Sequence, residues 1–143
     1  MTESYIAKAE VDVDAPASGV WHALTDPDKV AQYFFGSRVE TDWQPGSPIV
    51  WKGEYNGKAF EDKGEILEVQ PNRLLKMSHF SPMSGQPDKL ENYHTLTYEL
   101  DERDGATHVS LSQDNNGSEE EAQRATANWE AMLAGLKKTA EGG

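Results

Sequence analysis

Cysteine is absent from this 143-residue sequence, and long apolar runs are absent as well. Without cysteine the chain can form no disulfide, no thiol nucleophile and no cysteine-ligated zinc site. A cysteine-free chain agrees with a reducing compartment, and the first five residues show neither the basic nor the apolar region of a secretory signal. No apolar run approaches the roughly 18 residues that a membrane-spanning helix needs. We therefore expect a soluble, cytoplasmic protein.

Basic residues are few, because 13 Lys and Arg stand against 25 Asp and Glu and give a formal charge of −12. Nucleic-acid binding depends on neutralising phosphates with Lys and Arg, so DNA and RNA are excluded as partners. Anionic membrane surfaces are disfavoured for the same reason, and no membrane insertion is expected. We interpret the acidity as a solubility feature. A basic protein partner is an alternative that no specific signal supports.

Sequence motifs of the common catalytic and cofactor sites are missing. The chain contains neither a Walker pattern nor a Gly-x-Ser-x-Gly pattern. Its four histidines show no His-x-His or His-Glu-x-x-His spacing, so we predict no metal site and no cofactor. Ser78, Ser81 and Ser84 lie near His79 in the sequence, but no carboxylate follows that could orient the histidine. A hydrolase triad is therefore not predicted.

The N-terminal part of the sequence changes from a strand pattern to a helix pattern. Residues 5–13 alternate apolar and polar side chains, which is typical of a half-buried strand. Residues 17–24 carry an apolar face at helical spacing, and Pro16 before them suits a first helical turn. The Thr-Asp-Pro sequence at 25–27 predicts a second short helix, which Gly36 ends.

The middle of the sequence predicts an antiparallel meander. Asn56-Gly57 and Asp104-Gly105 are turn signals between alternating runs. Residues 81–92 break the periodicity with two prolines and a glycine, and we interpret them as a mobile loop that gates the site. The predicted strands cover residues 38–43, 49–55, 64–70, 75–80, 94–100 and 108–113.

The C-terminal part predicts one long amphipathic helix. Ser118 and Glu121 form a capping box, in which each side chain can satisfy an N–H group of the first turn. Glu119 and Glu120 also suit the positive end of the helix dipole. One face is then apolar for about five turns. Its residues are Ala122, Ala125, Trp129, Met132, Leu133, Leu136 and Ala140.

These elements predict an α+β fold in a single domain, residues 1–143. A curved antiparallel sheet of about six to seven strands grips the long C-terminal helix, and two short helices follow the first strand. An antiparallel sheet needs one face covered, and the C-terminal helix is the only predicted element long enough to cover it.

Three segments resemble a known superfamily. Residues 13–27, Val-Asp-Ala-Pro-Ala-Ser-Gly-Val-Trp-His-Ala-Leu-Thr-Asp-Pro, are similar to the opening signature of the START-like (SRPBCC), helix-grip superfamily, which includes the birch-pollen allergen type and the polyketide cyclases. Residues 64–74 are similar to the central strand and turn of its bacterial heat-shock-protein-90 ATPase activator-like branch. Residues 128–137, with a Trp and two Leu positions, resemble the C-terminal helix motif of that branch.

The resemblance implies a hydrophobic cavity between the helix and the sheet, used for lipids, polyketides, hormones or other apolar molecules. It covers essentially the whole chain and is more specific for fold than for function. The eukaryotic activators of the family carry an additional N-terminal domain, for which 143 residues leave no room. The ligand itself cannot be named from the motifs.

The inward parity of the strands and the apolar helix face give the candidate ligand-binding residues. A small-molecule site combines apolar walls with a few polar groups that fix the orientation of the ligand. The alternative is that these residues only fill the core. The candidates are Trp51, Tyr55, Met77, His79, His94, Tyr98, Gln113, Trp129, Met132 and Leu136.

His79 and His94 are the candidates with the most chemical potential. We expect them on neighbouring strands joined by residues 81–92, both on the inward face. A buried histidine near Tyr98 can act as a general acid or base, because its pKa lies near neutrality. A histidine bonded only to backbone or water is the alternative. His22 and His108 are expected to point to solvent.

Three functions remain open at this point. The first is a binding module, with an apolar small molecule in an enclosed pocket of roughly 300–1,000 Å³. The second is a cyclase- or lyase-type enzyme that uses His79, His94 or Tyr98, although no catalytic residue is assigned and enzymatic activity is not favoured. The third is a stress-related domain that modulates a chaperone, which requires an exposed apolar patch.

Overall fold

A computed structural model describes residues 5–33, 38–55, 57–80, 87–89, 92–116 and 118–142. The chain forms seven strands and three helices within these residues. In chain order they are β1 (Tyr5–Val13), α1 (Ala17–Thr25), α2 (Pro27–Tyr33), β2 (Arg38–Glu40), β3 (Pro48–Tyr55), β4 (Lys58–Gln70), β5 (Leu74–His79), β6 (His94–Arg103), β7 (Ala106–Asn116) and α3 (Glu119–Gly142).

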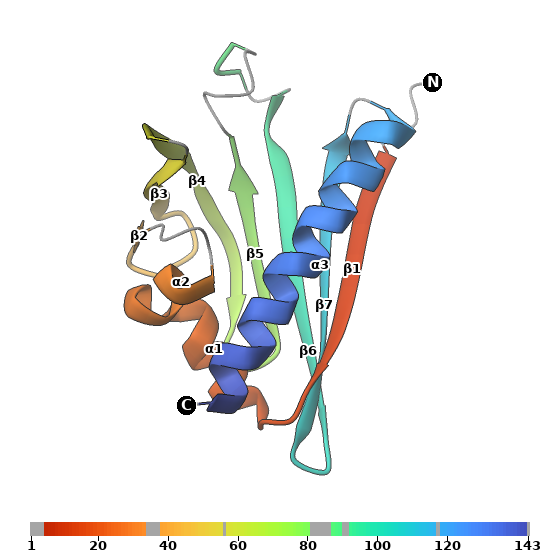
Figure 1. Ribbon diagram of the computed structural model, residues 1–143. Helices are drawn as coiled ribbons and strands as arrows, with labels where there is room; N and C mark the ends of the chain where they lie inside the picture. Colours follow the sequence, from red (N-terminus) through yellow and green to blue (C-terminus); the bar gives the residue numbers. More distant parts are fainter. Residues whose placement is uncertain are drawn as a thin grey trace.

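The seven strands form one antiparallel sheet in the order β1-β7-β6-β5-β4-β3-β2. The first strand therefore lies beside the last, and the three-residue strand β2 forms the opposite edge. Figure 1 shows α3 running diagonally across one face of this sheet. The predicted helix-grip fold is confirmed, including the two short helices after the first strand. Among the described residues, no helix is long and apolar enough to cross a membrane.

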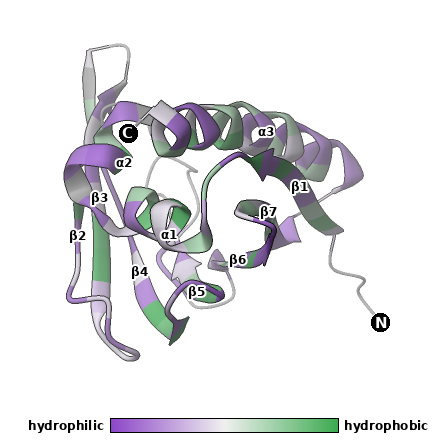
Figure 2. Ribbon diagram, turned by 90° about the horizontal axis from the view of Figure 1, so that it is seen from below, coloured by the Kyte–Doolittle hydropathy of each residue, from purple (hydrophilic) through white to green (hydrophobic). Residues whose placement is uncertain are grey.

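The sheet curves strongly at β4. The N-terminal half of β4 pairs with β3 and the C-terminal half pairs with β5, with a register shift between Ile66 and Glu68. Gly64 lies at the change of partner, where a Cβ atom would come within 1.8 Å of the Ser78 carbonyl oxygen. Bulges and strand glycines permit such bends and close approaches. Seen from below in Figure 2, the sheet bends around α1, and α3 lies across the open side.

Helix α3 packs on β1 and β7 and, toward its end, on α1 and α2. Its side chains Met132, Leu133 and Leu136 are buried, and burying one such side chain contributes roughly 1.5–3 kcal/mol. The Ser118 hydroxyl accepts the Glu121 N–H at 3.1 Å, so this half of the predicted capping box is observed. The helix covers the sheet as the sequence predicts.

Helix α1 is held at its N-terminus by a distant carboxylate. Pro16 occupies the cap position and offers no side-chain hydrogen bond. Instead Glu102, at the end of β6, accepts the Ala17 N–H at 2.6 Å. The buried hydroxyl of Thr107 donates to the Ala15 carbonyl at 2.8 Å. The β6–β7 hairpin therefore fixes where α1 starts and how Leu24 is placed over the sheet.

Some predicted element boundaries are wrong. The strand predicted over 38–43 ends at Glu40, because Trp43 has a positive φ of 58° that a strand cannot contain. Strand β4 starts at Lys58 rather than residue 64, since the carboxylate at inward position 62 hides the apolar alternation. Strand β7 extends to Asn116 rather than residue 113.

Other sequence predictions fall on residues that are not described. Gly36, as the end of α2, and most of the predicted gating loop, residues 81–86, 90 and 91, lie outside the described residues. Asp88 of that loop accepts a hydrogen bond from the Tyr93 hydroxyl at 2.6 Å and also pairs with Lys63 of β4. Phe80 and Tyr93 stack with ring centroids 5.1 Å apart. These contacts tie the second part of the loop to the sheet.

Candidate functional site

A small apolar cavity lies between the two short helices and the curved part of the sheet. Its volume is about 20 Å³, which is room for about one water molecule. The expected pocket of roughly 300–1,000 Å³ is not preformed at this place, because large side chains fill it. The lining residues are Leu24, Val30, Val39, Trp43, Ile49, Trp51, Leu75, Met77, Leu96 and Tyr98.

Strand register explains which residues reach the cavity. Leu75 of β5 lies opposite Tyr98 of β6, and Met77 lies opposite Leu96, so these two cross-strand pairs form the floor. Ile49 and Trp51 reach the cavity from β3, with the two-residue period of a strand. The short helices contribute Leu24 and Val30 from the opposite side. Helix α3 contributes none of the ten lining residues.

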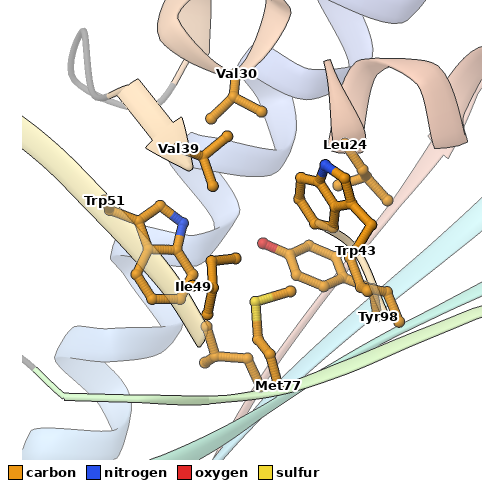
Figure 3. A pocket seen from close by; sticks show the side chains of 10 residues that line it. Leu24, Val30, Val39, Trp43, Ile49, Trp51, Met77 and Tyr98 are labelled. Atoms are coloured by element: carbon orange, nitrogen blue, oxygen red, sulfur yellow. The ribbon is translucent and has the colours of Figure 1, made fainter. Parts of the chain in front are cut away.

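Two indoles and one hydroxyl give the cavity its chemistry. Figure 3 shows Trp51 and Trp43 on opposite sides, with the Tyr98 hydroxyl and the Met77 thioether pointing between them. Tyr98 is 7% exposed, and burial raises its pKa above the ordinary value. The phenol therefore keeps its proton at neutral pH and offers one hydrogen-bonding group on an otherwise apolar wall.

Trp43 holds its place in the wall through an uncommon backbone conformation. Its φ of 58° lies in the left-handed region, which for a bulky residue costs about 1–2 kcal/mol. It follows β2, an edge strand that pairs with β3 through only three residues. Strained residues concentrate at ligand clamps and switch regions. This part of the wall therefore combines a strained residue with a short edge strand.

A polar row follows the apolar floor on the same face of the sheet. His79 lies opposite His94, one inward position beyond Met77 and Leu96. The two imidazole centroids are 6.5 Å apart with an interplanar angle of 29°. The Trp51 ring packs edge-on against His79 at 5.0 Å, so this one indole touches both the cavity and the polar row.

Each of these histidines is anchored through one ring nitrogen. His79 Nε2 lies 2.9 Å from Asp62 Oδ2, and the two side chains are 14% and 12% exposed. His94 Nδ1 lies 2.8 Å from the Asp114 carbonyl oxygen. Two further atoms of the first pair, Asp62 Oδ1 and His79 Nδ1, are buried without a hydrogen-bond partner. Such orphaned atoms each cost roughly 1–3 kcal/mol.

The structure separates the predicted site residues into three groups. Trp51, Met77 and Tyr98 line the cavity, and His79 and His94 form the polar row behind it. Tyr55 belongs to β3, but its side chain lies outside what is described. The remaining residues, Gln113, Trp129, Met132 and Leu136, lie where α3 meets the sheet or in the core and do not line this cavity.

Gln113 has a structural contact that sequence parity cannot show. Its Oε1 accepts the Trp129 Nε1–H at 2.7 Å, and its Nε2 donates to Asn116 Oδ1 at 2.9 Å. The Oε1 end of the buried amide therefore holds α3 on β7, and the Nε2 end makes a bond within β7. The exposed histidines behave as expected: His22 pairs with Asp26, and His108 pairs with Asp12 and Glu10. Among the described residues, no three His, Asp or Glu side chains are grouped for a metal ion.

Sequence reasoning missed several residues of the site. Trp43 sits in a loop whose conformation no alternation predicts, and Leu24 and Val30 were assigned to helices without a place in the pocket. Asp62 carried a usable signal, because it lies four positions before the inward Ile66 on the same strand. Extending that parity backward through Gly64 places the carboxylate inward, beside the expected position of His79.

Comparison with known proteins adds the family. A model of the family described as "Activator of Hsp90 ATPase homolog 1-like protein" matches residues 14–141. The solution structure of ChR145 from Cytophaga hutchinsonii is 46% identical, covers 99% of this chain and 97% of its own, and superposes with a TM-score of 0.86. The comparison with curated proteins returned no match.

Two more distant structures share the fold. DynU16, a protein in the dynemicin biosynthetic locus, is 21% identical over 93% of this chain and 46% of its own, with a TM-score of 0.76. The Aha1 dimer from Colwellia psychrerythraea is 17% identical over 95% of this chain and 96% of its own, with a TM-score of 0.72. Because the family model spans most of the sequence and the helix-grip architecture agrees with it, the chain belongs to the Activator of Hsp90 ATPase homolog 1-like family.

Proposed function

We propose that the protein binds an aromatic or other apolar small molecule in the cavity beneath α1 and α2. The observation that carries this proposal is the wall itself. Two tryptophans face each other across apolar side chains from six elements, and a single buried hydroxyl points between them. Small-molecule sites have this composition of apolar walls with few polar groups.

Binding requires the cavity to open, because about 20 Å³ holds no ligand. Trp43 has a strained backbone and follows the three-residue edge strand β2, so this part of the wall is the proposed entry. Displacing the Trp43 indole joins the cavity to solvent, and a backbone change at this residue would also release the left-handed strain. A ligand then takes the place of the indole in the cavity that Tyr98 and Met77 also line. The closed form is the resting state, and the ligand selects the open one.

The relatives support a small-molecule ligand in general terms. DynU16 has the same fold and is encoded in a biosynthetic locus. Lipids and aromatic polyketide-type compounds are the two ligand classes to compare first.

Thermal unfolding with a panel of both classes tests the proposal. A ligand that binds only the native state, at a concentration about 100-fold above its Kd, stabilises by about 2.7 kcal/mol. For a chain of this size the midpoint then rises by about 8 °C. Native mass spectrometry of protein purified from its own host reports any co-purified ligand. A broad panel without any shift, together with ligand-free protein from the host, would refute the proposal.

A Trp43→Ala variant tests the entry route. Removing the indole opens the cavity in advance, so an aromatic ligand binds more tightly and associates faster than in the wild type. Trp21→Ala is the matched control, because Trp21 is a half-buried tryptophan of α1 that does not line the cavity. Equal effects of the two substitutions would show that Trp43 is not the gate.

A cyclase- or lyase-type enzyme is the second candidate. The buried Asp62–His79 pair favours it, because a histidine oriented by a carboxylate can accept a proton from a bound molecule. Mass spectrometry and NMR of a co-purified ligand, before and after incubation with fresh protein, would detect a chemical change. An unchanged ligand leaves binding as the function.

Chaperone modulation, which the family description suggests, has weaker support. Among the described residues, the large exposed apolar side chains are Tyr5 and Ile6 on β1 and Leu67 on β4. Three strands separate β1 from β4 in the sheet order, so these side chains form no contiguous patch. A chaperone captured reproducibly by the purified protein would reverse this ranking.

A further inference from the structure

The inward face of the sheet is amphipathic along the strands. The cross-strand pairs Leu75–Tyr98 and Met77–Leu96 form an apolar floor, and the next pair on that face is His79–His94. Asp62 lies beside this last pair, bonded to His79. A molecule that enters over the apolar floor therefore meets a polar end after two rows of side chains.

The hydrogen bond to Asp62 determines which nitrogen of His79 carries the proton. A carboxylate only accepts hydrogen bonds, so Nε2 at 2.9 Å from Oδ2 is the donor. In the neutral imidazole this leaves Nδ1 as a bare acceptor, and Nδ1 is buried without a partner. His94 follows the same logic with the nitrogens exchanged: Nδ1 donates to the Asp114 carbonyl, and Nε2 keeps the lone pair.

With both imidazoles neutral, the polar row therefore offers acceptors, and its two ring N–H groups are already used. Asp62 Oδ1 is a second buried acceptor without a partner, and its side chain belongs to a residue that is only 8% exposed. An anionic ligand head group, such as a fatty-acid carboxylate, would place its charge beside the Asp62 carboxylate and finds no free N–H among the two imidazoles. A neutral hydroxyl group supplies the missing donor.

We infer that the ligand is a neutral, hydroxyl-bearing aromatic molecule whose O–H donates to Nδ1 of His79 while Asp62 fixes the orientation of the imidazole. This inference rests on the proposed function and narrows its ligand class from apolar molecules in general to phenol-type molecules. The Trp51 indole is the partition between floor and polar row, because it lines the cavity and packs edge-on against His79. Rotation of the Trp51 side chain would join the space over the apolar floor to the polar row.

A matched pair of compounds tests the inference. β-Naphthol and β-methylnaphthalene have nearly the same shape, but only the first can donate a hydrogen bond. Titration of the protein with each, followed by quenching of the fluorescence of the cavity tryptophans and by calorimetry, gives two affinities. The informative quantity is the ratio of these affinities, because it cancels the apolar contribution that both compounds share.

The double variant Asp62→Leu with His79→Phe removes the proposed acceptor without leaving a buried charge unpaired, so the variant is expected to fold. The preference for β-naphthol over β-methylnaphthalene falls about tenfold in this variant, while β-methylnaphthalene binds about as well as before. His108→Gln is the control, since it removes an imidazole from the outward face of β7. In that control the ratio is unchanged.

The outcomes separate the inference from the proposed function. One outcome is that the double variant binds β-methylnaphthalene as tightly as the wild type does and keeps the same preference for β-naphthol. That outcome overturns the role of His79 and leaves apolar binding intact. A wild-type protein that binds neither compound overturns the inference, and the thermal panel and native mass spectrometry then decide the proposed function separately. A single Asp62→Asn variant supplies an independent measurement, because an amide allows the imidazole to reverse its tautomer. Loss of preference in that variant, with a new ring nitrogen carrying the proton by ¹⁵N NMR, supports the orienting role of Asp62.

Discussion

At the scale of single residues, Gly64 sets how closely β4 and β5 approach. The position is inward between Asp62 and Ile66, and a Cβ atom there would meet the Ser78 carbonyl carbon at 2.6 Å and the His79 nitrogen at 3.2 Å. These are backbone atoms, which cannot rotate away as a side chain can. The same glycine therefore places both the bend of the sheet and the His79 side chain.

Gly64→Ala is predicted to destabilise the protein by roughly 3 kcal/mol or more, because relieving the overlap requires a backbone shift in β5. Urea unfolding followed by tryptophan fluorescence measures the loss. Gly142→Ala is the control, since nothing lies within 4 Å of its added methyl group and alanine suits the helix. Stability equal to the wild type in Gly64→Ala would show that the strands separate at little cost.

Single residues could be predicted from the sequence where they belong to a regular apolar–polar alternation, and not where the alternation is interrupted. Leu96 and Tyr98 lie in a strand with a clean two-residue period, and both are buried as parity predicts. Trp43 could not be placed, because its position depends on one left-handed φ angle. Asp62 stayed hidden because a carboxylate at an inward position looks like a break in the pattern.

At the scale of elements, His108 joins β7 to β1. Its Nδ1 lies 2.7 Å from Asp12 Oδ1 and its Nε2 lies 3.3 Å from Glu10 Oε1, on the outward face of the sheet. The hydrogen bond to Asp12, followed by the bond to Glu10, raises the pKa of the imidazole above the ordinary value near 6.5. The protonated ring is therefore favoured in the folded state.

This shift predicts a pH dependence with a definite sign. Because the folded-state pKa is raised, the stabilising contribution is fully present below the unfolded pKa of about 6.5 and is lost as the pH rises through the folded value. The His108 side chain is 43% exposed, so solvent screening keeps the effect below about 1 kcal/mol. Urea midpoints across this range should fall for the wild type relative to His108→Gln. Parallel pH profiles of the two proteins would contradict the prediction.

Elements with long, regular patterns were predicted well, and short ones were not. Helix α3 has five turns of apolar spacing and a capping signal, and its start and its buried face agree with the structure. The cavity was predicted beneath this helix, yet α1 and α2 roof it. Their place over the sheet depends on contacts from afar, such as Glu102 with the Ala17 N–H. Spacing within a helix carries no information about such contacts.

At the scale of the whole molecule, the charge of −12 opposes compaction. Raising the salt concentration from about 0.01 M to about 1 M shortens the Debye length from roughly 30 Å to roughly 3 Å. The repulsion among the acidic side chains is then screened, while the few exposed ion pairs lose little, because each contributes little. The thermal midpoint should therefore rise with potassium chloride. A falling midpoint would mean that ion pairs outweigh net repulsion.

The strand order also has a consequence for how the chain folds during synthesis. Strand β1 pairs only with β7, whose register joins Tyr5 to Asn116 and Val13 to Thr107. Of these seven strands, β1 leaves the ribosome first, and it has no neighbour until nearly a hundred further residues have been made, since Val13 pairs with Thr107. Closing so long a loop slows folding. Until then the nascent chain exposes an unpaired β-edge, and this interval is when it is most exposed to aggregation and to capture by other proteins.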